Sequence, residues 1–366
     1  MKVDMAEWKV TRKQKKLIKE VLQSGRLTYG EKTRELERRF AEIHGVKHAL
    51  FTSSGTAALK IALHALKDKE GWKDGDEVIV PSVTFIATMN VVLMNNLKPV
   101  LVDVNPATVN IDTAQIEAAI TKKTKAIIPV HLLGQPADMD AILKIAKKHK
   151  LKVIEDSCET MFVNKVQGDV ACFSTYLAHL LVTGIGGFIC TNDDELATVM
   201  RSMMFHGRDE SYLNIDDKPT DISKRFYFPR FGYSDRMTEL EAALGLGDLD
   251  NWQAMIKKRQ DNADYLRAGL VSVVSFPWPY MANHSFMFFP MLVERRDELA
   301  EYLEKQSIQT RTMMPLTTQP LAKPYLKKKY PGADYINEHG LLLGCHQFLT
   351  RKDLDWVIKS IEEFYR

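Results

Sequence analysis

The feature of this sequence that most constrains its fold is a regular alternation of strand-like and helix-like segments over its first two thirds. Short runs rich in β-branched residues lie between segments in which apolar residues recur at helical spacing. Such runs are typical of strands that are buried on both faces of a parallel sheet. We therefore predict an α/β fold with a largely parallel sheet covered by helices. The expected strands are residues 49–52, 77–80, 99–104, 126–130, 152–156, 171–174 and 187–191.

The pattern changes after about residue 250, which predicts a second domain. Residues 237–249 and 249–269 have the composition of helices, and we expect the second, a long charged helix, to link two domains. A strand is predicted at 286–293, and amphipathic helices at 295–306 and 353–365. We predict a large domain over residues 1–250 and a smaller α+β domain over residues 251–366. The first 25 or so residues are candidates for packing on the smaller domain.

The overall charge of the 366 residues is close to balanced, with 50 lysines and arginines against 47 aspartates and glutamates and a formal net charge of +3. That balance does not indicate binding to nucleic acid or to a membrane surface. No apolar run reaches the ~20 residues that cross a bilayer, and the charged segment 1–19 lacks the apolar stretch of a signal peptide. We expect a cytoplasmic protein. The four cysteines form no CxxC pair, so neither a metal site nor a redox motif is predicted.

Three motifs follow predicted strands, where ligands bind in α/β proteins. Ser54-Gly55-Thr56 joins a strand to a helix, and its small residues allow a phosphate to approach the helix N-terminus, although a tight turn would look the same. Asp156 ends a strand and is able either to pair with a protonated ring nitrogen or to cap a helix. Phe85 follows another strand, and its ring is able either to stack on a ligand or to pack in the core.

His179 stands alone in a segment without other charged side chains, five residues after Ser174. A single histidine among apolar residues is more often a core residue than a catalyst. The following Gly184-Ile185-Gly186-Gly187 is not a dinucleotide-binding motif, because it precedes a strand rather than a helix.

Taken together, these motifs resemble the sugar aminotransferases of fold type I, the DegT/StrS family, over nearly the whole chain. The resemblance implies the fold of a pyridoxal-phosphate-dependent transferase and a cofactor that is pyridoxal phosphate or pyridoxamine phosphate. The motifs in order are Thr28-Tyr29-Gly30, Ser54 to Leu59, Pro81 to Phe85, Val130 to Pro136, Glu155-Asp156, Gly186-Gly187, His206-Gly207, Gly232 to Met237 and Ala242 to Gly245.

The resemblance also implies roles for individual residues. Gly55, Thr56 and Ser174 would hold the cofactor phosphate, and Phe85 would stack on its ring. Asp156 would meet the ring nitrogen, and Gln135 would lie near the ring oxygen. The family forms homodimers with shared active sites, in which Ser234 would reach the phosphate of the neighbouring subunit, although many relatives carry asparagine there.

His179 occupies the position at which most of the family has the lysine that binds the cofactor covalently, and no lysine occurs between Lys165 and Lys218. With Asp156-Ser157-Cys158-Glu159 nearby, this resembles the deoxysugar 3-dehydratase branch. The branch implies a nucleotide-linked 4-keto-6-deoxy sugar as substrate, glutamate as amino donor, and His179 as the base that takes a proton from the cofactor's C4′. A related dehydratase holds an iron–sulfur cluster, but the dispersed cysteines here predict none.

Two other functions remain open at this point: an aminotransferase that works without the lysine, and a catalytically silent cofactor- or sugar-binding regulator. Arg311 and His346 are candidate substrate contacts from the smaller domain, or surface and packing residues. The segment from Met161 to Gly168 looks shorter than in the family, so the family's substrate contacts from that loop cannot be carried over to this chain. Ile185 stands where many relatives have glutamate, so a polar role at that position is lost.

Overall fold

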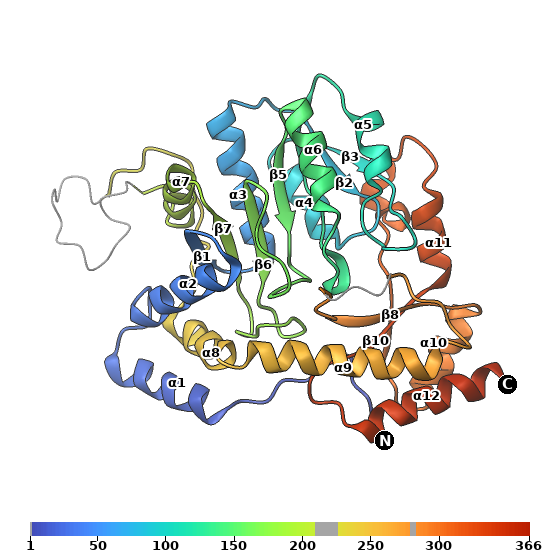
Figure 1. The fold of residues 1–366 in the computed structure, drawn as a ribbon. Helices are drawn as coiled ribbons and strands as arrows, with labels where there is room; N and C mark the ends of the chain where they lie inside the picture. The colour runs from blue at the N-terminus through green and yellow to red at the C-terminus, as the bar shows by residue number, and fades with distance from the viewer. Residues whose placement is uncertain (1, 209–225, 279–282) are drawn as a thin grey trace.

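The computed structural model describes residues 2–208, 226–278 and 283–366. The strands and helices alternate through the first two thirds of the chain, as the sequence predicts (Figure 1). The strands are β1 (His48–Thr52), β2 (Glu77–Pro81), β3 (Lys98–Val102), β4 (Thr124–Ile127), β5 (Lys152–Asp156), β6 (Val170–Ser174), β7 (Gly187–Thr191), β8 (Phe288–Leu292), β9 (Thr310–Thr312) and β10 (Gly340–Gly344). The helices are α1 (Arg12–Ser24), α2 (Glu31–His44), α3 (Gly55–Glu70), α4 (Ile86–Met94), α5 (Ile116–Ala119), α6 (Met139–His149), α7 (Asp194–Met204), α8 (Glu239–Leu249), α9 (Trp252–Leu270), α10 (Arg296–Lys305), α11 (Pro331–His339) and α12 (Arg351–Tyr365).

The large sheet has the strand order β1-β7-β6-β5-β4-β2-β3. Strands from β6 to β3 run parallel to their neighbours, and β7 runs antiparallel to both β6 and β1. The prediction of a largely parallel α/β sheet is therefore confirmed. The parallel strands place their carboxyl ends at one edge of the sheet, which is where ligands bind in this architecture.

Both faces of the large sheet are buried, because alternate residues of each strand point to opposite cores. Leu50, Ile154 and Ile189 contribute to one core, which also takes in apolar residues of α3, α4 and α7. On the other face, Phe40 of α2 stacks on Phe188 with ring centroids 3.9 Å apart. α5 and α6 cover the same side farther along the sheet. This burial on both faces explains why the strand sequences do not alternate between apolar and polar residues.

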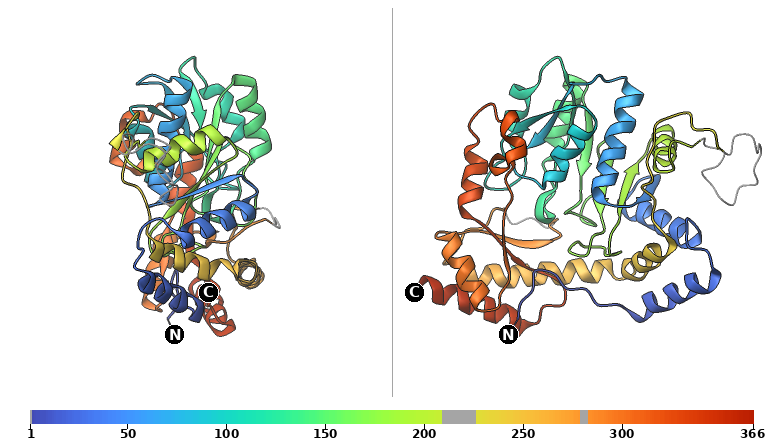
Figure 2. Two further views of the ribbon diagram at one scale, coloured as in Figure 1. Left: turned by 90° about the vertical axis from the view of Figure 1, so that its left-hand side faces the viewer. Right: turned by 180° about the vertical axis from the view of Figure 1, so that it is seen from behind.

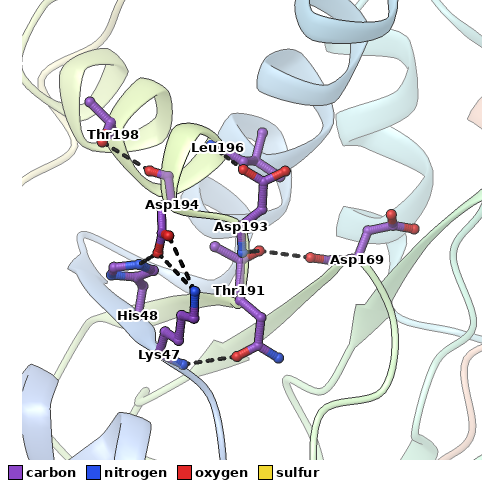
Figure 3. Close-up of polar contacts among 9 residues, drawn as sticks. Lys47, His48, Asp169, Thr191, Asp193, Asp194, Leu196 and Thr198 are labelled. Atoms are coloured by element: carbon purple, nitrogen blue, oxygen red, sulfur yellow. Dashed lines mark hydrogen bonds and ion pairs between the residues drawn. The ribbon is translucent and has the colours of Figure 1, made fainter.

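The carboxyl end of β7 lies at the opposite end of the sheet from the carboxyl ends of the parallel strands, and polar contacts fix it there (Figure 3). The Thr191 hydroxyl donates to the Asp169 carbonyl at 2.9 Å, and Asp193 caps α7 by accepting from Leu196 N–H. Lys47 and His48 both contact the Asp194 carboxylate. These contacts lie at the amino end of β1 and the carboxyl end of β7, opposite the edge of the sheet where ligands bind.

A second, three-stranded sheet of order β8-β10-β9 forms in the last third of the chain, with α9 running along the molecule towards it (Figures 1 and 2). The N-terminal segment joins this sheet, since Val3 forms a parallel bridge with Ile308 and Met5 N–H donates to Gln309. Helix α1 then packs on α8, where the buried Gln14 side chain donates to Asp248 at 2.8 Å. Among the described residues, no helix is long and apolar enough to cross a membrane.

Candidate active site

A cavity of about 730 Å³ opens at the carboxyl ends of the parallel strands. It lies between that edge of the large sheet and the second sheet, whose strands β8, β9 and β10 supply one of its walls. Of the residues predicted to form the site, those lining the cavity are Gly55, Thr56, Phe85, Asp156, Ser174, His179 and Arg311. The structure thus brings together side chains from segments that are far apart in the sequence.

One end of the cavity is formed by the first turn of α3 and has the properties of a phosphate site. Ser54 caps the helix by accepting from Ala57 N–H, so the unpaired N–H groups of the first turn face outward near the cavity. A Cβ atom added to Gly55 would lie 2.6 Å from Cys158 Sγ and 2.9 Å from Ser174 Cβ. Gly55 is therefore needed for the close approach of α3 to β6, and Ser174 lies against the same turn.

Asp156 at the end of β5 is buried and held by two hydrogen bonds. Its Oδ2 accepts from the Thr88 hydroxyl at 2.7 Å, and its Oδ1 accepts from Cys158 N–H at 3.2 Å. Burial raises the pKa of the Asp156 carboxyl, and the bond from Thr88 opposes that rise. Phe85 begins α4 beside it with half of its surface exposed, which leaves a ring face free to stack on a flat ligand.

His179 lies in the loop between β6 and β7, and hydroxyl contacts make this loop compact. Thr175 and Thr183 bond to each other at 2.6 Å, and His179 N–H donates to the Tyr176 carbonyl at 2.9 Å. The imidazole Nδ1 is buried with no hydrogen-bond partner among the described residues. Burial lowers the pKa of His179 to about 4. The ring is therefore neutral at physiological pH, and Nε2 is the nitrogen left for contact with a ligand.

Glu159 is a cavity residue whose role was not predicted from the sequence. Its Oε2 accepts from Leu133 N–H at 2.8 Å. Leu133 has a φ of 59°, a left-handed conformation that is uncommon for leucine, and this backbone geometry directs its N–H at Glu159. Burial raises the pKa of Glu159 to about 7, and the charge of Asp156 adds to the rise. The sequence shows an acidic residue three positions after Asp156. It does not show that this carboxyl is buried and that its pKa is therefore raised.

The wall formed by the second sheet is apolar, with Met287, Phe288, Met313, Met314 and Leu342 facing the cavity. Arg311 of β9 lies on the same wall, is exposed, and has no ion pair among residues 2–208, 226–278 and 283–366. A guanidinium without a carboxylate partner at a cavity is suited to binding an anion. Sequence reasoning identified Arg311 but none of the apolar residues, because their contact with the large sheet depends on the tertiary fold.

Three of the predicted site residues lie outside the cavity lining. Gln135 is buried behind Leu132 and Leu133, where its carbonyl accepts from Asn110. Ser234 is exposed and accepts from Arg236 at 3.0 Å, and the carbonyl of the following residue, Asp235, accepts from Ser53 N–H. His346 is buried, and its carbonyl accepts from Asn262 at 2.9 Å. The position of His346 gives no support to a substrate contact.

The short segment after Thr160 turns away from the cavity. Met161 and Phe162 pack in the core formed by α2 and the large sheet, and Val166 N–H donates to the His44 carbonyl. No cavity-lining residue lies between Glu159 and Ser174. Ile185 lines the cavity with an exposed aliphatic side chain, where the family resemblance leads us to expect a glutamate.

The fold and the arrangement of the cavity define an enzyme of the aminotransferase fold. The chain belongs to the DegT/DnrJ/EryC1/StrS aminotransferase family, whose family model matches residues 9–362. This confirms the resemblance inferred from the motifs. Among its relatives, GDP-perosamine synthase of Caulobacter vibrioides is 36% identical over 345 residues, which cover 90% of this chain and 89% of the relative.

Two solved dehydratase structures superpose closely on this chain. GDP-4-keto-6-deoxy-D-mannose-3-dehydratase of Escherichia coli, with bound hydrated pyridoxal phosphate, has a TM-score of 0.90 and 27% identity, covering 99% of this chain and all of the other. A GDP-4-keto-6-deoxymannose-3-dehydratase with a trapped pyridoxal phosphate–glutamate geminal diamine has a TM-score of 0.90 and 26% identity, covering 98% of this chain and 100% of the other. The cofactor in both agrees with the prediction of pyridoxal or pyridoxamine phosphate.

The residues at the cavity fit this cofactor. The first turn of α3 with Gly55 offers a cradle for a phosphate that a larger residue would fill, and Asp156 is a buried carboxylate able to pair with a protonated ring nitrogen. Phe85 presents an exposed ring face at the same cavity. These residues are therefore suited to bind a planar ring that carries a phosphate and a protonated ring nitrogen.

Proposed function

We propose that this protein is a pyridoxamine-phosphate-dependent 3-dehydratase acting on a nucleotide-linked 4-keto-6-deoxy sugar. The observation that carries the proposal is that His179 lines the cavity, while no lysine lines the cavity within the described part of the chain. The motif resemblance implies that His179 takes the position of the family's lysine. The cofactor then has no covalent anchor at the expected position. A neutral imidazole is a proton acceptor that does not compete with the substrate for the cofactor.

The residues of this chain take distinct roles in the proposed reaction. Gly55, Thr56 and Ser174 bind the phosphate, and Phe85 stacks on the ring. Asp156 holds the ring nitrogen in its protonated form. When bound, pyridoxamine phosphate supplies an amine that condenses with the keto carbon of the sugar and a ring that accepts electrons.

His179 supplies the proton transfer of the dehydration. Its imidazole would take a proton from C4′ of the bound cofactor, whose ring would supply the electron sink for loss of the hydroxyl from the third carbon of the sugar. His179 then carries the proton that the leaving hydroxyl needs to depart as water. The low pKa of His179 keeps its base form available throughout the neutral range.

Glutamate is the proposed amino donor that regenerates the amine form of the cofactor, in keeping with the glutamate adduct of the dehydratase neighbour. Arg311 is the proposed anion contact on the second-sheet wall, either for a glutamate carboxylate or for the sugar's diphosphate.

A homodimer with shared active sites completes the proposal, with Ser234 reaching the neighbouring subunit's cofactor phosphate. The exposure of Ser234 supports this arrangement.

Glu159 predicts a pH dependence of cofactor binding. Glu159 is protonated below pH 7 and becomes a second buried carboxylate, close to Asp156, as the pH rises through about 7. Repulsion of the anionic cofactor is then expected to weaken binding of pyridoxamine phosphate about tenfold between pH 6 and pH 8. Glu159→Gln should remove this contribution. The dissociation constant of the cofactor is measured by fluorescence titration in the wild type and the variant. Titration of the cofactor phosphate affects both proteins alike, so it cancels in the comparison. If the dissociation constant changes with pH to the same extent in both, the assignment to Glu159 is contradicted.

The second candidate function is an aminotransferase acting on a nucleotide-linked keto sugar without the lysine. It is favoured by the 36% identity to the UDP-2-acetamido-2-deoxy-3-oxo-D-glucuronate aminotransferase of Pseudomonas aeruginosa, which is higher than the identity to the solved dehydratases. Both functions use the same fold and cofactor. They differ in whether the product has lost an oxygen or gained a nitrogen.

The deciding experiment incubates the purified protein with pyridoxal phosphate, glutamate and a nucleotide-linked 4-keto-6-deoxy sugar, and determines the mass of the product. A 3-deoxy keto sugar supports the dehydratase, and an amino sugar supports the aminotransferase. Borohydride treatment in parallel should fix no cofactor to the protein, because His179 cannot form the reducible bond that lysine forms. A fixed adduct would mean that another lysine substitutes. Cofactor binding with no turnover of glutamate would identify a silent binding protein.

A further inference from the structure

A chain of two buried hydroxyl groups leads to the Asp156 carboxylate. The Thr84 and Thr88 hydroxyls lie 2.8 Å apart, and the Thr88 hydroxyl donates to Asp156 Oδ2 at 2.7 Å. Thr84, Thr88 and Asp156 are each less than 5% exposed. Helix α4 begins just after Phe85 with no side chain capping its N-terminus, so these hydroxyls bond to each other and to Asp156 rather than to the helix backbone.

The direction of the hydrogen bonds follows from the charge of Asp156. An ionised carboxylate only accepts, so Thr88 must give its single hydroxyl proton to Asp156 and accept in turn from Thr84. Hydrogen bonds to the charged form of a carboxyl favour that form. Each hydroxyl in such a chain also polarises the next. The chain therefore stabilises ionised Asp156 in a place where burial alone would favour the protonated acid.

We propose that Thr88, supported by Thr84, is a positioning residue that keeps Asp156 ionised and oriented, and thereby keeps the ring nitrogen of the bound cofactor protonated. Thr88 acts through Asp156 and is not itself among the residues that line the cavity. The inference rests on the proposed pairing of Asp156 with the ring nitrogen. It does not depend on whether the enzyme removes a hydroxyl or transfers an amine.

The other ionisable groups around Asp156 do not replace Thr88 in this role. Cys158 is half-buried and Cys172 is buried, and burial raises the pKa of both thiols well above the usual value, while Glu159 is an acid that is neutral below pH 7. His131 is the remaining neighbour. Its Nε2 lies 2.9 Å from the buried Glu155 carboxylate and its Nδ1 accepts from Ala137 N–H, so both ring nitrogens are occupied away from Asp156. The Cys158 thiol also donates to the Asp156 carboxylate, but it lowers the Asp156 pKa less than the Thr88 hydroxyl, which donates to Oδ2 at 2.7 Å.

The test uses the full-length protein and pyridoxamine phosphate labelled with ¹⁵N in the ring. The ¹⁵N chemical shift of the bound cofactor reports whether the ring nitrogen is protonated, and a fluorescence titration gives the dissociation constant. Thr88→Val removes the hydroxyl at nearly constant volume, and Thr88→Ser retains it. Thr191→Val is the matched control, because it removes another buried threonine hydroxyl at the opposite end of the sheet (Figure 3).

We expect Thr88→Val to reduce the protonated fraction of the ring nitrogen and to weaken cofactor binding roughly ten- to hundredfold, the effect of losing a hydrogen bond to a charged group. Thr88→Ser and Thr191→Val should keep the wild-type ¹⁵N shift. Wild-type protonation and affinity in Thr88→Val would overturn the inference, and so would weaker binding with an unchanged ¹⁵N shift, which is the result expected of a purely structural role.

Two further variants keep the outcome interpretable. Asp156→Asn tests the underlying pairing: if the ring nitrogen stays protonated in that variant, the proposed role of Asp156 fails and the inference fails with it. If Asp156→Asn loses protonation and Thr88→Val does not, only the inference fails. Should Thr88→Val not fold, Thr84→Val decides, because it removes the donor to Thr88 and should lower the protonated fraction to a smaller extent; an unchanged fraction would count against the hydroxyl chain.

Discussion

His179→Asn is expected to lower the rate of dehydration by about 10²–10⁴-fold, the usual contribution of a general base, while binding of pyridoxamine phosphate changes little. Asparagine is close to histidine in size and still polar, but its amide cannot take up a proton at neutral pH. The phosphate cradle at Gly55 and the Asp156 carboxylate belong to other elements and are untouched by the change. Single-turnover measurement of product formation, with a parallel cofactor titration, separates the two effects.

A surface histidine supplies the control for this substitution. His149 lies at the end of α6, paired with Glu117 and outside the cavity, so His149→Asn should retain full activity. The pH profile adds a second check. Since burial lowers the pKa of His179 to about 4, kcat/KM should keep its full value down to about pH 5 and fall only as His179 becomes protonated near pH 4. Retained turnover in His179→Asn would rule out the base assignment.

The strands of the large sheet were predicted well because they are buried on both faces, which leaves a continuous apolar run in the sequence, whereas β9 and β10 of the second sheet were not predicted. Val78-Ile79-Val80 of β2 illustrates this, since Val78 and Val80 pack in one core and Ile79 in the other. Residues at the ends of such strands, Asp156 and Ser174 among them, could be assigned to one site because parallel strands end at one edge. The sequence also marks Gly55, where the close approach to Cys158 and Ser174 excludes a side chain.

The parts of the site that the sequence did not reveal depend on contacts between distant segments. The Leu133 N–H that binds Glu159 is directed by a left-handed backbone conformation that leucine rarely adopts. This conformation is held from outside, because Ser285 N–H donates to the Gly134 carbonyl and Met287 N–H to the Leu133 carbonyl. No local pattern predicts a turn that is fixed by residues some 150 positions later in the chain. The apolar cavity wall escapes prediction for the same reason.

The Thr28-Tyr29-Gly30 motif shows how a family signature can reflect stability rather than catalysis. The Tyr29 hydroxyl donates to the buried Glu37 carboxylate at 3.0 Å, and Glu37 also accepts from the Phe51 N–H of β1. Gly30 leaves room for Glu239, whose carboxylate would lie 2.8 Å from an added Cβ and accepts from the Gly30 N–H. These contacts anchor β1, the strand that leads into the phosphate cradle.

Arg201→Met should lower the free energy of unfolding by about 3–5 kcal/mol at neutral pH, the usual cost of removing one partner of a buried ion pair. Arg201 of α7 makes two hydrogen bonds of 2.9 Å to Glu37 of α2, and both side chains are largely buried. Methionine replaces the aliphatic part of arginine but leaves the Glu37 charge without a cation. Urea unfolding measured by circular dichroism gives the change in unfolding free energy.

A surface arginine on α2, the helix that carries Glu37, supplies the matched control. Arg38 is exposed and pairs with Glu35 and Glu42 at the surface, so Arg38→Met should leave the free energy of unfolding nearly unchanged. An equal loss of stability in both variants would mean that packing of the arginine side chain, and not the buried charge of Glu37, stabilises this part of the fold.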